Sequence, residues 1–404
     1  MQRKHWKKQF YILWAGQTVS LLTSSVTQYA LLWHLTQRTG SAAVLSLAAL
    51  MGFLPMAVFG PFTGSLADRW DRRRIMIAAD MAIAGAALIL VVWGTGNVLP
   101  IPLIHGVLFL RALGTAFHQP CLNAVTPLMV PVDELDRCAG RTQAFQSIST
   151  LVSPALAALL YSLMPLNLLM GLDVLGAAAG VLAVWLAHIP STPGEGPFEK
   201  VHVLRDTLEG LTYLYRRRGL FALTMVATLL SFAYIPAASL YPLMVLIRFD
   251  GTTAHAGIIE TGFSVGMLLG GAILAALRGP KQRIFLMAAS LTVIGLTITG
   301  MGLLPPEGLV VFGVLTLLSG LAAPFFQGLF MALLQRKVRP DYLGRAMGVS
   351  GSLMSLACPL GLAAAGAVAE AWGAPVWFIA GGLLCVLCAG LCMLVPAVRH
   401  VDEE

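Results

Sequence analysis

The chain contains 404 residues, of which 57% are hydrophobic and only 11% are charged, and its mean hydropathy is +0.80. Soluble domains carry about 25% charged residues, so this composition excludes a soluble enzyme and indicates a chain mostly immersed in lipid. A dozen membrane crossings at ~20 residues each would use about 240 residues. Large domains outside the membrane are therefore not expected.

Apolar runs of membrane length recur along the whole chain and predict an all-α membrane protein with twelve transmembrane helices. The first six are expected at 10–34, 43–66, 75–94, 101–121, 142–163 and 166–188. The second six are expected at 220–247, 257–277, 284–303, 309–333, 346–368 and 376–395. Turn formers such as Gly96-Asn97 and Pro305-Pro306 separate neighbouring runs. The first run is too long for a signal peptide and lacks a small-residue cleavage site, so we expect a retained helix.

The distribution of basic residues predicts the orientation in the membrane. The two ends of the chain and every second connection between spans carry 23 of the 26 Lys and Arg residues. The remaining connections hold only Arg38 and Arg248, and Arg111 lies within a span. Basic residues in short loops stay on the cytoplasmic side, so both termini are expected in the cytoplasm. The net charge of +7 then marks this face and attracts anionic membrane lipid, rather than forming a nucleic-acid surface.

A proline-rich segment divides the twelve spans six and six. The predicted organisation is an N-terminal six-helix bundle at 1–190, a cytoplasmic linker with an amphipathic helix at 191–218, and a C-terminal six-helix bundle at 219–404. Leu204, Leu208, Leu211 and Tyr215 recur at helical spacing among charges in the linker, which is typical of a helix on the inner membrane surface. Spans five and eleven both open with Gly-Arg and contain a proline. Such parallel repeats are typical of secondary transporters that bind their substrate at midplane.

The connection between spans two and three closely resembles the signature loop of the major facilitator superfamily. The matching residues are Gly64, Leu66, Asp68, Arg69, Arg72 and Arg73. Asp71 departs from the pattern, which has glycine there. The resemblance implies the major facilitator fold and a cytoplasmic gate in which Asp68 is held against the eleventh helix. The alternative is that these basic residues only anchor the loop inside.

The fifth span resembles the antiporter motif of the same superfamily, with small residues in place of three glycines. Gly140, Ser149, Ser153 and Pro154 carry this resemblance. Small residues let a helix approach its neighbour, and proline bends it. The resemblance implies export by antiport, although stripes of small residues are common in membrane helices.

Four ionisable residues lie inside predicted spans, where each charge costs on the order of 3 kcal/mol at the bilayer centre. Arg111 is expected near midplane in span four, and Asp173 or Asp80 lies at a similar depth as its ion-pair partner. For Asp80 a structural pair is favoured over coupling. Glu260 stands near the outer end of span eight, where apolar surroundings favour a neutral carboxyl that can load and release a proton. The alternative for Glu260 is a solvated carboxylate at the interface.

Polar and aromatic side chains predict a large, adaptable and mostly apolar substrate cavity, which fits a bulky amphiphilic ligand. A polar stripe on a membrane helix must face protein or water, although about half of these residues could instead serve helix packing. The first half contributes Gln17, Ser24, Gln28, Gln143 and Gln146. The second half contributes Tyr234, Tyr241, Phe325, Phe326 and Gln327.

Several chemical motifs are absent from the sequence. No phosphate-binding loop occurs, which removes ATP as a direct energy source within the chain, and no catalytic or metal-binding motif is found. The Cys-x-x-Cys within the last span has no nearby histidine and predicts packing residues. We likewise interpret His34 and His118 as packing or interfacial residues. No enzyme activity and no cofactor are expected.

Longer blocks resemble the Mef-type macrolide efflux proteins over nearly the whole chain. They include the run from Arg111 to Ser153 and the segments Trp14-Ala-Gly-Gln17 and Tyr342-Leu-Gly-Arg345. The resemblance implies a proton-driven exporter of macrolides in the cell membrane. A macrolide carries a tertiary amine, and we hypothesise that Glu260 is the partner of its positive charge. We expect the protein to be monomeric. Two alternatives stay open: a siderophore exporter of the same branch, and a non-transporting receptor on the same scaffold. Participation of an ATP-binding cassette partner protein also stays open.

Overall fold

The structure is a computed structural model that describes residues 6–69, 71–96, 98–131, 134–187, 189, 203–277, 282–399 and 401. The described residues form helices joined by short connections, and contain no strand. Within these ranges the structure describes only the backbone of some residues, among them Gly64, Asp68, Arg69, Gly140 and Gln143. The described chain is thus all-α, as the sequence predicts.

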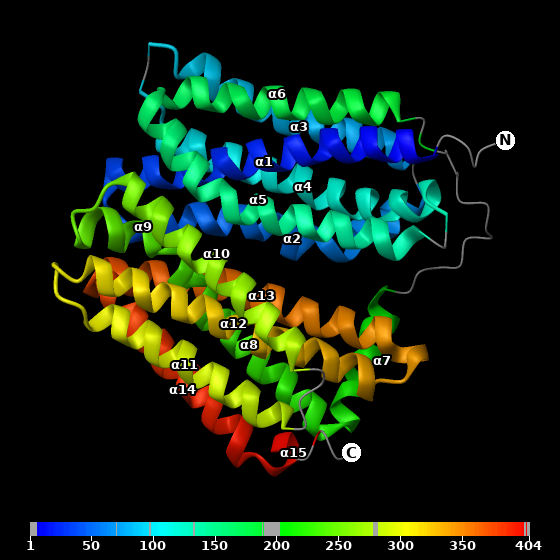
Figure 1. Cartoon of the computed structure of the whole chain (residues 1–404), viewed down its shortest axis with the longest axis vertical. Helices are drawn as coiled ribbons and strands as arrows, with labels where there is room; N and C mark the ends of the chain where they lie inside the picture. Colours follow the sequence, from blue (N-terminus) through cyan, green and yellow to red (C-terminus); the bar gives the residue numbers. More distant parts are fainter. Residues whose placement is uncertain are drawn as a thin grey trace. The chain divides into compact units, whose positions relative to one another are not determined.

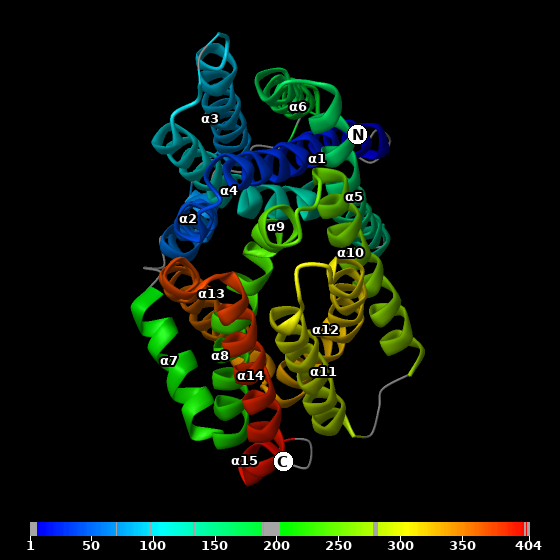
Figure 2. The same ribbon diagram turned by 90° about the vertical axis from the view of Figure 1, so that its left-hand side faces the viewer.

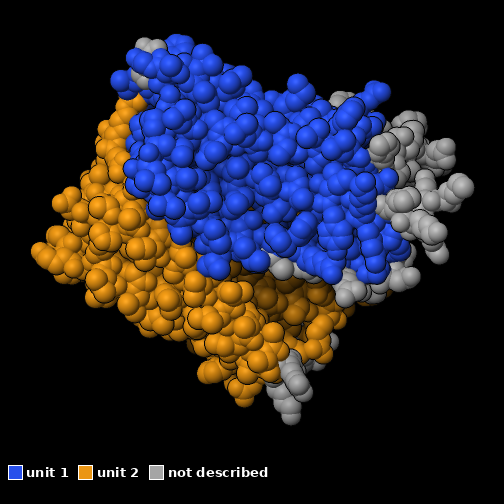
Figure 3. All heavy atoms as spheres, turned by 45° about the horizontal axis from the view of Figure 1, so that its top comes forward, with its two compact units in different colours: residues 1–35, 51–201 blue, residues 36–50, 202–404 orange. Residues whose placement is uncertain are grey.

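By backbone contacts the chain divides into two compact units (Figure 3). Unit 1 comprises residues 1–35 and 51–201, and unit 2 comprises residues 36–50 and 202–404. The helices that lie wholly or mainly in unit 1 are α1 (Trp6–Thr39), α2 (Ala42–Arg69), α3 (Arg72–Trp93), α4 (Ile101–Met129), α5 (Leu135–Leu163) and α6 (Leu166–Leu186).

Unit 2 begins with α7 (Val203–Arg216) and α8 (Arg218–Ser239), followed by the short α9 (Tyr241–Leu243) and the π-helix η3 (Met244–Arg248). The long helices that follow are α10 (Thr253–Ala276), α11 (Arg283–Leu303), α12 (Leu309–Lys337), α13 (Pro340–Trp372) and α14 (Ala374–Leu394), and the chain continues into the short α15 (Pro396–Arg399). In this unit α11 packs along α14 and α10 packs along α12 (Figures 1 and 2).

Eleven helical segments in the described part are long and apolar enough to cross a membrane. They are α2 to α6, the continuous run from α8 to η3, and α10 to α14. The twelfth predicted span lies within α1, which is 34 residues long and is less apolar because of its polar stripe. Leu163, Leu175 and Leu394 are each more than two-thirds exposed, as expected for side chains that face lipid rather than water.

Local sequence explains where the helices begin and end. Asp71 caps α3 by accepting a hydrogen bond from the Arg73 backbone N–H, and the Thr252 side chain caps α10 in the same way. Gly373, with φ of +89°, separates α13 from α14, because glycine adopts this left-handed region without strain.

The start of α2 belongs to unit 2, where it packs on α13. Ala49 is buried with Cys358 and Leu362. At the first turn of α2 the Glu370 carboxylate accepts hydrogen bonds from the Ser41 hydroxyl at 2.9 Å and the Ala43 backbone N–H at 3.1 Å. A carboxylate is favoured there because backbone N–H groups at a helix N-terminus lack partners within the helix.

The predicted amphipathic helix corresponds to α7. Leu211 and Leu214 pack into the core of unit 2, whereas Leu208 and Tyr215 are exposed. Tyr213 stacks on Tyr342 of α13, with ring centroids 4.7 Å apart. Thus α7 uses one face to dock on α13. The proline-rich linker before it, at 190–202, lies outside the described residues.

Candidate functional site

A buried ion pair joins α4 and α6 within unit 1. The Arg111 guanidinium lies 3.1 Å from the Asp173 carboxylate, and these side chains are only 7% and 0% exposed. Of the two carboxylates that the sequence offered to Arg111, the structure pairs it with Asp173.

Helix α1 supplies additional hydrogen bonds to this pair. The Ser24 hydroxyl donates to Asp173 at 2.6 Å. Arg111 donates to the Ser24 carbonyl and to the Thr27 hydroxyl, both at 3.0 Å. Removing a charge from water costs several kcal/mol per ion. The attraction between Arg111 and Asp173 does not offset this desolvation cost alone, and the hydrogen bonds from α1 help to offset it. The polar stripe of α1 therefore supports the buried charges.

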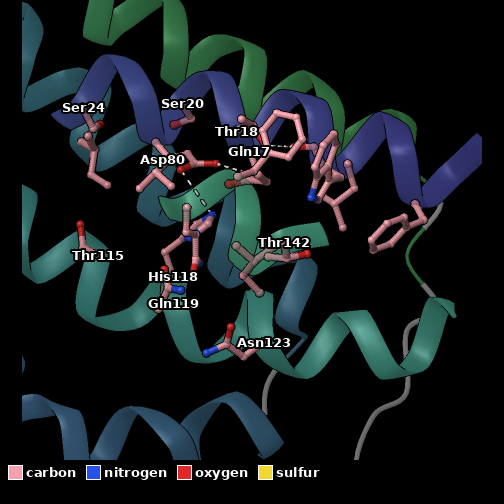
Figure 4. A pocket seen from close by; sticks show the side chains of 18 residues that line it. Gln17, Thr18, Ser20, Ser24, Asp80, Thr115, His118, Gln119, Asn123 and Thr142 are labelled. Atoms are coloured by element: carbon pink, nitrogen blue, oxygen red, sulfur yellow. Dashed lines mark hydrogen bonds and ion pairs between the residues drawn. The ribbon is translucent and has the colours of Figure 1, made fainter. Parts of the chain in front are cut away.

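Asp80 of α3 forms a second buried cluster. Its carboxylate lies 3.5 Å from His118 Nε2 of α4 and 3.5 Å from Gln17 Nε2 of α1 (Figure 4). Asp80 is 3% exposed and His118 is 7% exposed. Gly180 of α6 faces this cluster, and a Cβ at that position would lie 3.0 Å from Asp80 Oδ2. The absence of a side chain on Gly180 leaves room for the carboxylate.

The two clusters are separated by two helical turns along α4 and α6. His118 follows Arg111 by seven residues on α4, and Gly180 follows Asp173 by seven on α6. Seven residues of α-helix rise about 10.5 Å and return to nearly the same face. These two buried pairs of unit 1 thus lie in two layers, one with Arg111 and Asp173 and one with Asp80 and His118.

A cavity of about 130 Å³ adjoins the Asp80 layer. Its wall is formed by α1, α3, α4 and α5 (Figure 4). Gln17, Ser24 and Gln146, three of the residues predicted to line a substrate cavity, are part of this wall. This volume has room for several waters but is small for a bulky amphiphile.

The other predicted cavity residues of the first half are placed differently. Gln28 is half-buried on α1, and its amide nitrogen is 3.9 Å from where a Cβ on Gly52 of α2 would be. The Gln143 side chain is not described. On α5, Ser149 and Ser153 are buried. Ser153 directly precedes Pro154, and its hydroxyl donates to the Ser149 carbonyl at 2.5 Å. Gly140 lies near the start of this helix.

The aromatic residues predicted for the second half are mostly packed within unit 2. Tyr241 is buried among Phe312 and Phe378, at ring-centroid distances of 5.5 and 5.8 Å. Phe326 stacks on Phe330 in the core.

Three further predicted residues lie closer to the helix surfaces of unit 2. Tyr234 and Phe325 are half-buried, and Gln327 is exposed. The ring of Tyr234 contacts that of Phe263 at a centroid distance of 6.5 Å. The structure therefore buries Tyr241 and Phe326 in separate aromatic contacts and leaves the other three predicted residues less buried.

Glu260 lies about two turns into α10, which begins at Thr253. It is half-buried, and the Ser264 hydroxyl donates to its backbone carbonyl at 3.2 Å. Tyr241 is within electrostatic range of its carboxylate. Glu260 therefore stands beside the buried aromatic cluster of unit 2.

The described part of the predicted gate loop is held by local contacts. Asp71 caps α3 and lies 3.6 Å from the Arg74 guanidinium, a role that a glycine could not fill. Arg73 donates to the Trp185 carbonyl of α6 at 3.0 Å, and Arg72 is half-buried. The side chains of Gly64, Asp68 and Arg69 are outside the described part, so the expected gate contact of Asp68 stays a prediction.

Comparison with known proteins places this architecture in a family. Residues 13–361 match the family described as Major Facilitator Superfamily. The chain belongs to the major facilitator superfamily. It is 45% identical over 398 residues, 98% of both chains, to macrolide efflux protein A of Streptococcus pyogenes. It is 29% identical, over 96% of this chain and 92% of the relative, to the multidrug efflux pump Tap of Mycobacterium tuberculosis.

Solved structures support the same fold. The nucleoside transporter NupG aligns with a TM-score of 0.73 and 16% identity over 96% of this chain and 98% of its own. This major facilitator protein is thus a multi-pass membrane transporter closely related to Mef-type efflux proteins, as the sequence motifs imply.

Sequence reasoning missed one functional candidate in this transporter, namely His118. It was interpreted as a packing residue because a single histidine on an apolar helix usually is one. The structure places it against Asp80. The available signal was its position two turns after Arg111, which puts both on one face of α4.

Helices α1 and α6 pack closely where Gly176 of α6 faces Thr23 of α1. A Cβ on Gly176 would collide with the Thr23 side chain. We therefore expect Gly176→Val to force α1 and α6 apart and to lower stability by ~1–3 kcal/mol. Gly171 on the same helix has open space around it, so Gly171→Val is the matched control. Thermal unfolding of both variants in detergent measures the difference, and equal midpoints would contradict the prediction.

Proposed function

We propose that this protein exports macrolide antibiotics across the cell membrane in exchange for protons. The observation that carries the proposal is 45% identity to macrolide efflux protein A over 98% of both chains. Near-complete coverage means that the similarity extends along both chains and is not confined to one domain. The antiporter-type motif around Pro154 supports exchange rather than symport.

In the proposed cycle the predicted halves at 1–190 and 219–404 alternate between access from the cytoplasm and access from outside. The loop with Gly64, Asp68 and Arg69 serves as the cytoplasmic gate, and both termini lie in the cytoplasm. The small cavity of unit 1 is too small for a macrolide. The macrolide site is proposed to include Glu260, whose carboxylate faces the drug amine.

A second candidate is export of a wider set of amphiphilic compounds. The similarity to the multidrug efflux pump Tap favours it. Anionic substrates such as siderophores fit less well, because they would require surplus basic charge. In the described part of the membrane spans the buried basic side chain, Arg111, is neutralised by Asp173.

The test is erythromycin susceptibility and accumulation in cells that express this chain, with and without a protonophore. We expect a several-fold rise in the inhibitory concentration, lower accumulation, and loss of both effects when the protonophore collapses the gradient. Unchanged susceptibility would contradict macrolide export. Efflux that survives collapse of the gradient would contradict antiport and favour an ATP-binding cassette partner protein, and proteoliposomes that contain this chain alone separate these cases.

A further inference from the structure

The two buried ion pairs of unit 1 differ in their ability to change charge. The Arg111 guanidinium stays protonated under all physiological conditions. Protonation of Asp173 would leave that guanidinium buried without a counter-ion, which typically costs several kcal/mol. Moreover, Asp173 is held at 2.6 Å by Ser24. This pair is therefore fixed in its charged form.

Asp80 and His118 form a pair that can change charge. Imidazole is the side chain that exchanges a proton near neutral pH. With a neutral imidazole the pair carries one negative charge, and with an imidazolium it is neutral overall. Both states keep Asp80 beside Gln17. Gain or loss of a single proton therefore leaves no isolated cation in the protein interior.

The geometry around His118 leaves its ring nitrogen available. The Nε2 atom is buried and makes no hydrogen bond within the described part of the chain, and its 3.5 Å approach to Asp80 is long for an ion pair. His118 is more than nine-tenths buried and points, with Asp80, into the cavity (Figure 4). The cavity has room for waters that could deliver a proton to this atom.

Other charges near the pair are already balanced. On α4 and α6 the charged groups that face this region are Arg111 and Asp173, which neutralise each other. On α5, Arg141 is exposed and donates to the Tyr11 hydroxyl of α1. The described spans of α1, α2 and α3 present no other ionisable side chain to the cavity wall. Among the described residues that line the cavity, the charge is thus set by Asp80 and His118.

We propose that His118 and Asp80 form the proton-binding site of this exporter, a role that rests on the proposed proton-coupled export. One proton binds at His118 Nε2 and converts the pair from a net charge of −1 to zero. Loss of that proton restores the negative charge, which favours the presence of a cationic drug in the transporter. Binding of proton and drug is then coupled through charge, with Arg111 and Asp173 as a fixed support.

The test uses the full-length protein in proteoliposomes, with erythromycin as the substrate. We expect Asp80→Asn and His118→Gln to reduce pH-gradient-driven accumulation at least tenfold, because neither variant can exchange the proton that is coupled to erythromycin binding. His105→Gln is the control, because His105 is also a buried histidine on α4 but is not part of the cavity wall. The number of protons exchanged on drug binding is measured by calorimetry in buffers of different ionisation enthalpy.

A swapped variant, Asp80→His with His118→Asp, guards against simple misfolding, since it keeps a carboxylate and an imidazole together. We expect it to regain proton exchange that the single variants lack. If wild-type protein is proton-coupled and both single variants stay so, the assignment of this site is wrong while the proposed function stands. If the single variants lose drug binding and the swapped variant restores nothing, the pair is structural and the assignment is also wrong. If wild-type binding and transport show no proton linkage, the proposed antiport itself fails.

Discussion

Replacing Arg111 by leucine is expected to lower the stability of unit 1 by roughly 3–5 kcal/mol, the largest effect of any single substitution considered. The change leaves the fully buried Asp173 carboxylate without its cationic partner, and an uncompensated buried charge carries this penalty. It also removes the hydrogen bonds to Ser24 and Thr27. The measurement is thermal unfolding in detergent, followed with a thiol-reactive dye that reports exposure of the buried Cys121 and Cys138.

A double variant provides the control. Arg111→Leu combined with Asp173→Leu removes both charges, and replacing a whole buried pair with apolar residues is often tolerated. We therefore expect the double variant to be more stable than either single variant. A single Arg111→Leu variant that unfolds at the wild-type temperature would show that the pair contributes nothing.

Replacing Glu260 by glutamine is expected to reduce export of an amine-bearing macrolide by about tenfold or more. A charge-assisted hydrogen bond contributes about 1.5–3 kcal/mol, which corresponds to roughly a tenfold to hundredfold change in binding. The substitution keeps the size of the side chain and removes its charge. Erythromycin accumulation in cells that express each variant is the measurement.

Substrate chemistry sharpens this experiment. Export of an uncharged apolar substrate should be nearly unaffected by Glu260→Gln, because the lost interaction is with the cationic amine. Glu307 lies exposed between α11 and α12, so Glu307→Gln is the matched control. Equal loss for charged and uncharged substrates would indicate a structural role for Glu260, and unchanged resistance would remove it from the drug site.

The fold was predictable because its signals lie in continuous stretches of sequence. Apolar length predicted the spans, and most predicted ends lie within a few positions of the helix ends. The two largest departures are α4, which continues to Met129, and α5, which begins at Leu135, eight and seven residues beyond the expected 121 and 142. The gate and antiporter motifs indicated the family that the comparisons confirm. The polar stripe of α1 was recognised as facing protein, and Ser24 and Thr27 do bind the buried charges.

The partners of the buried charges were only partly predictable. Helical rise placed Asp80 and Asp173 at depths similar to that of Arg111, but it says nothing about the rotation of α3 and α6 around their axes. That rotation depends on packing at residues such as Gly176 and Gly180, where α6 comes close to its neighbours. Consequently the sequence predicted two alternative ion-pair partners for Arg111 and no partner for His118.

Helix α2 is shared by the two compact units, with residues up to Leu50 in unit 2 and residues from Met51 in unit 1. Pro55 lies four residues after Met51 in this continuous helix and has no N–H to donate to the Met51 carbonyl. Helices bend most readily where proline removes such a bond. Any movement of one unit against the other must therefore bend α2 near Met51 or break the bonds from Ser41 and Ala43 to Glu370. Helix α1 also crosses the boundary between the units, after Leu35, so the speed of such a movement would depend on both helices.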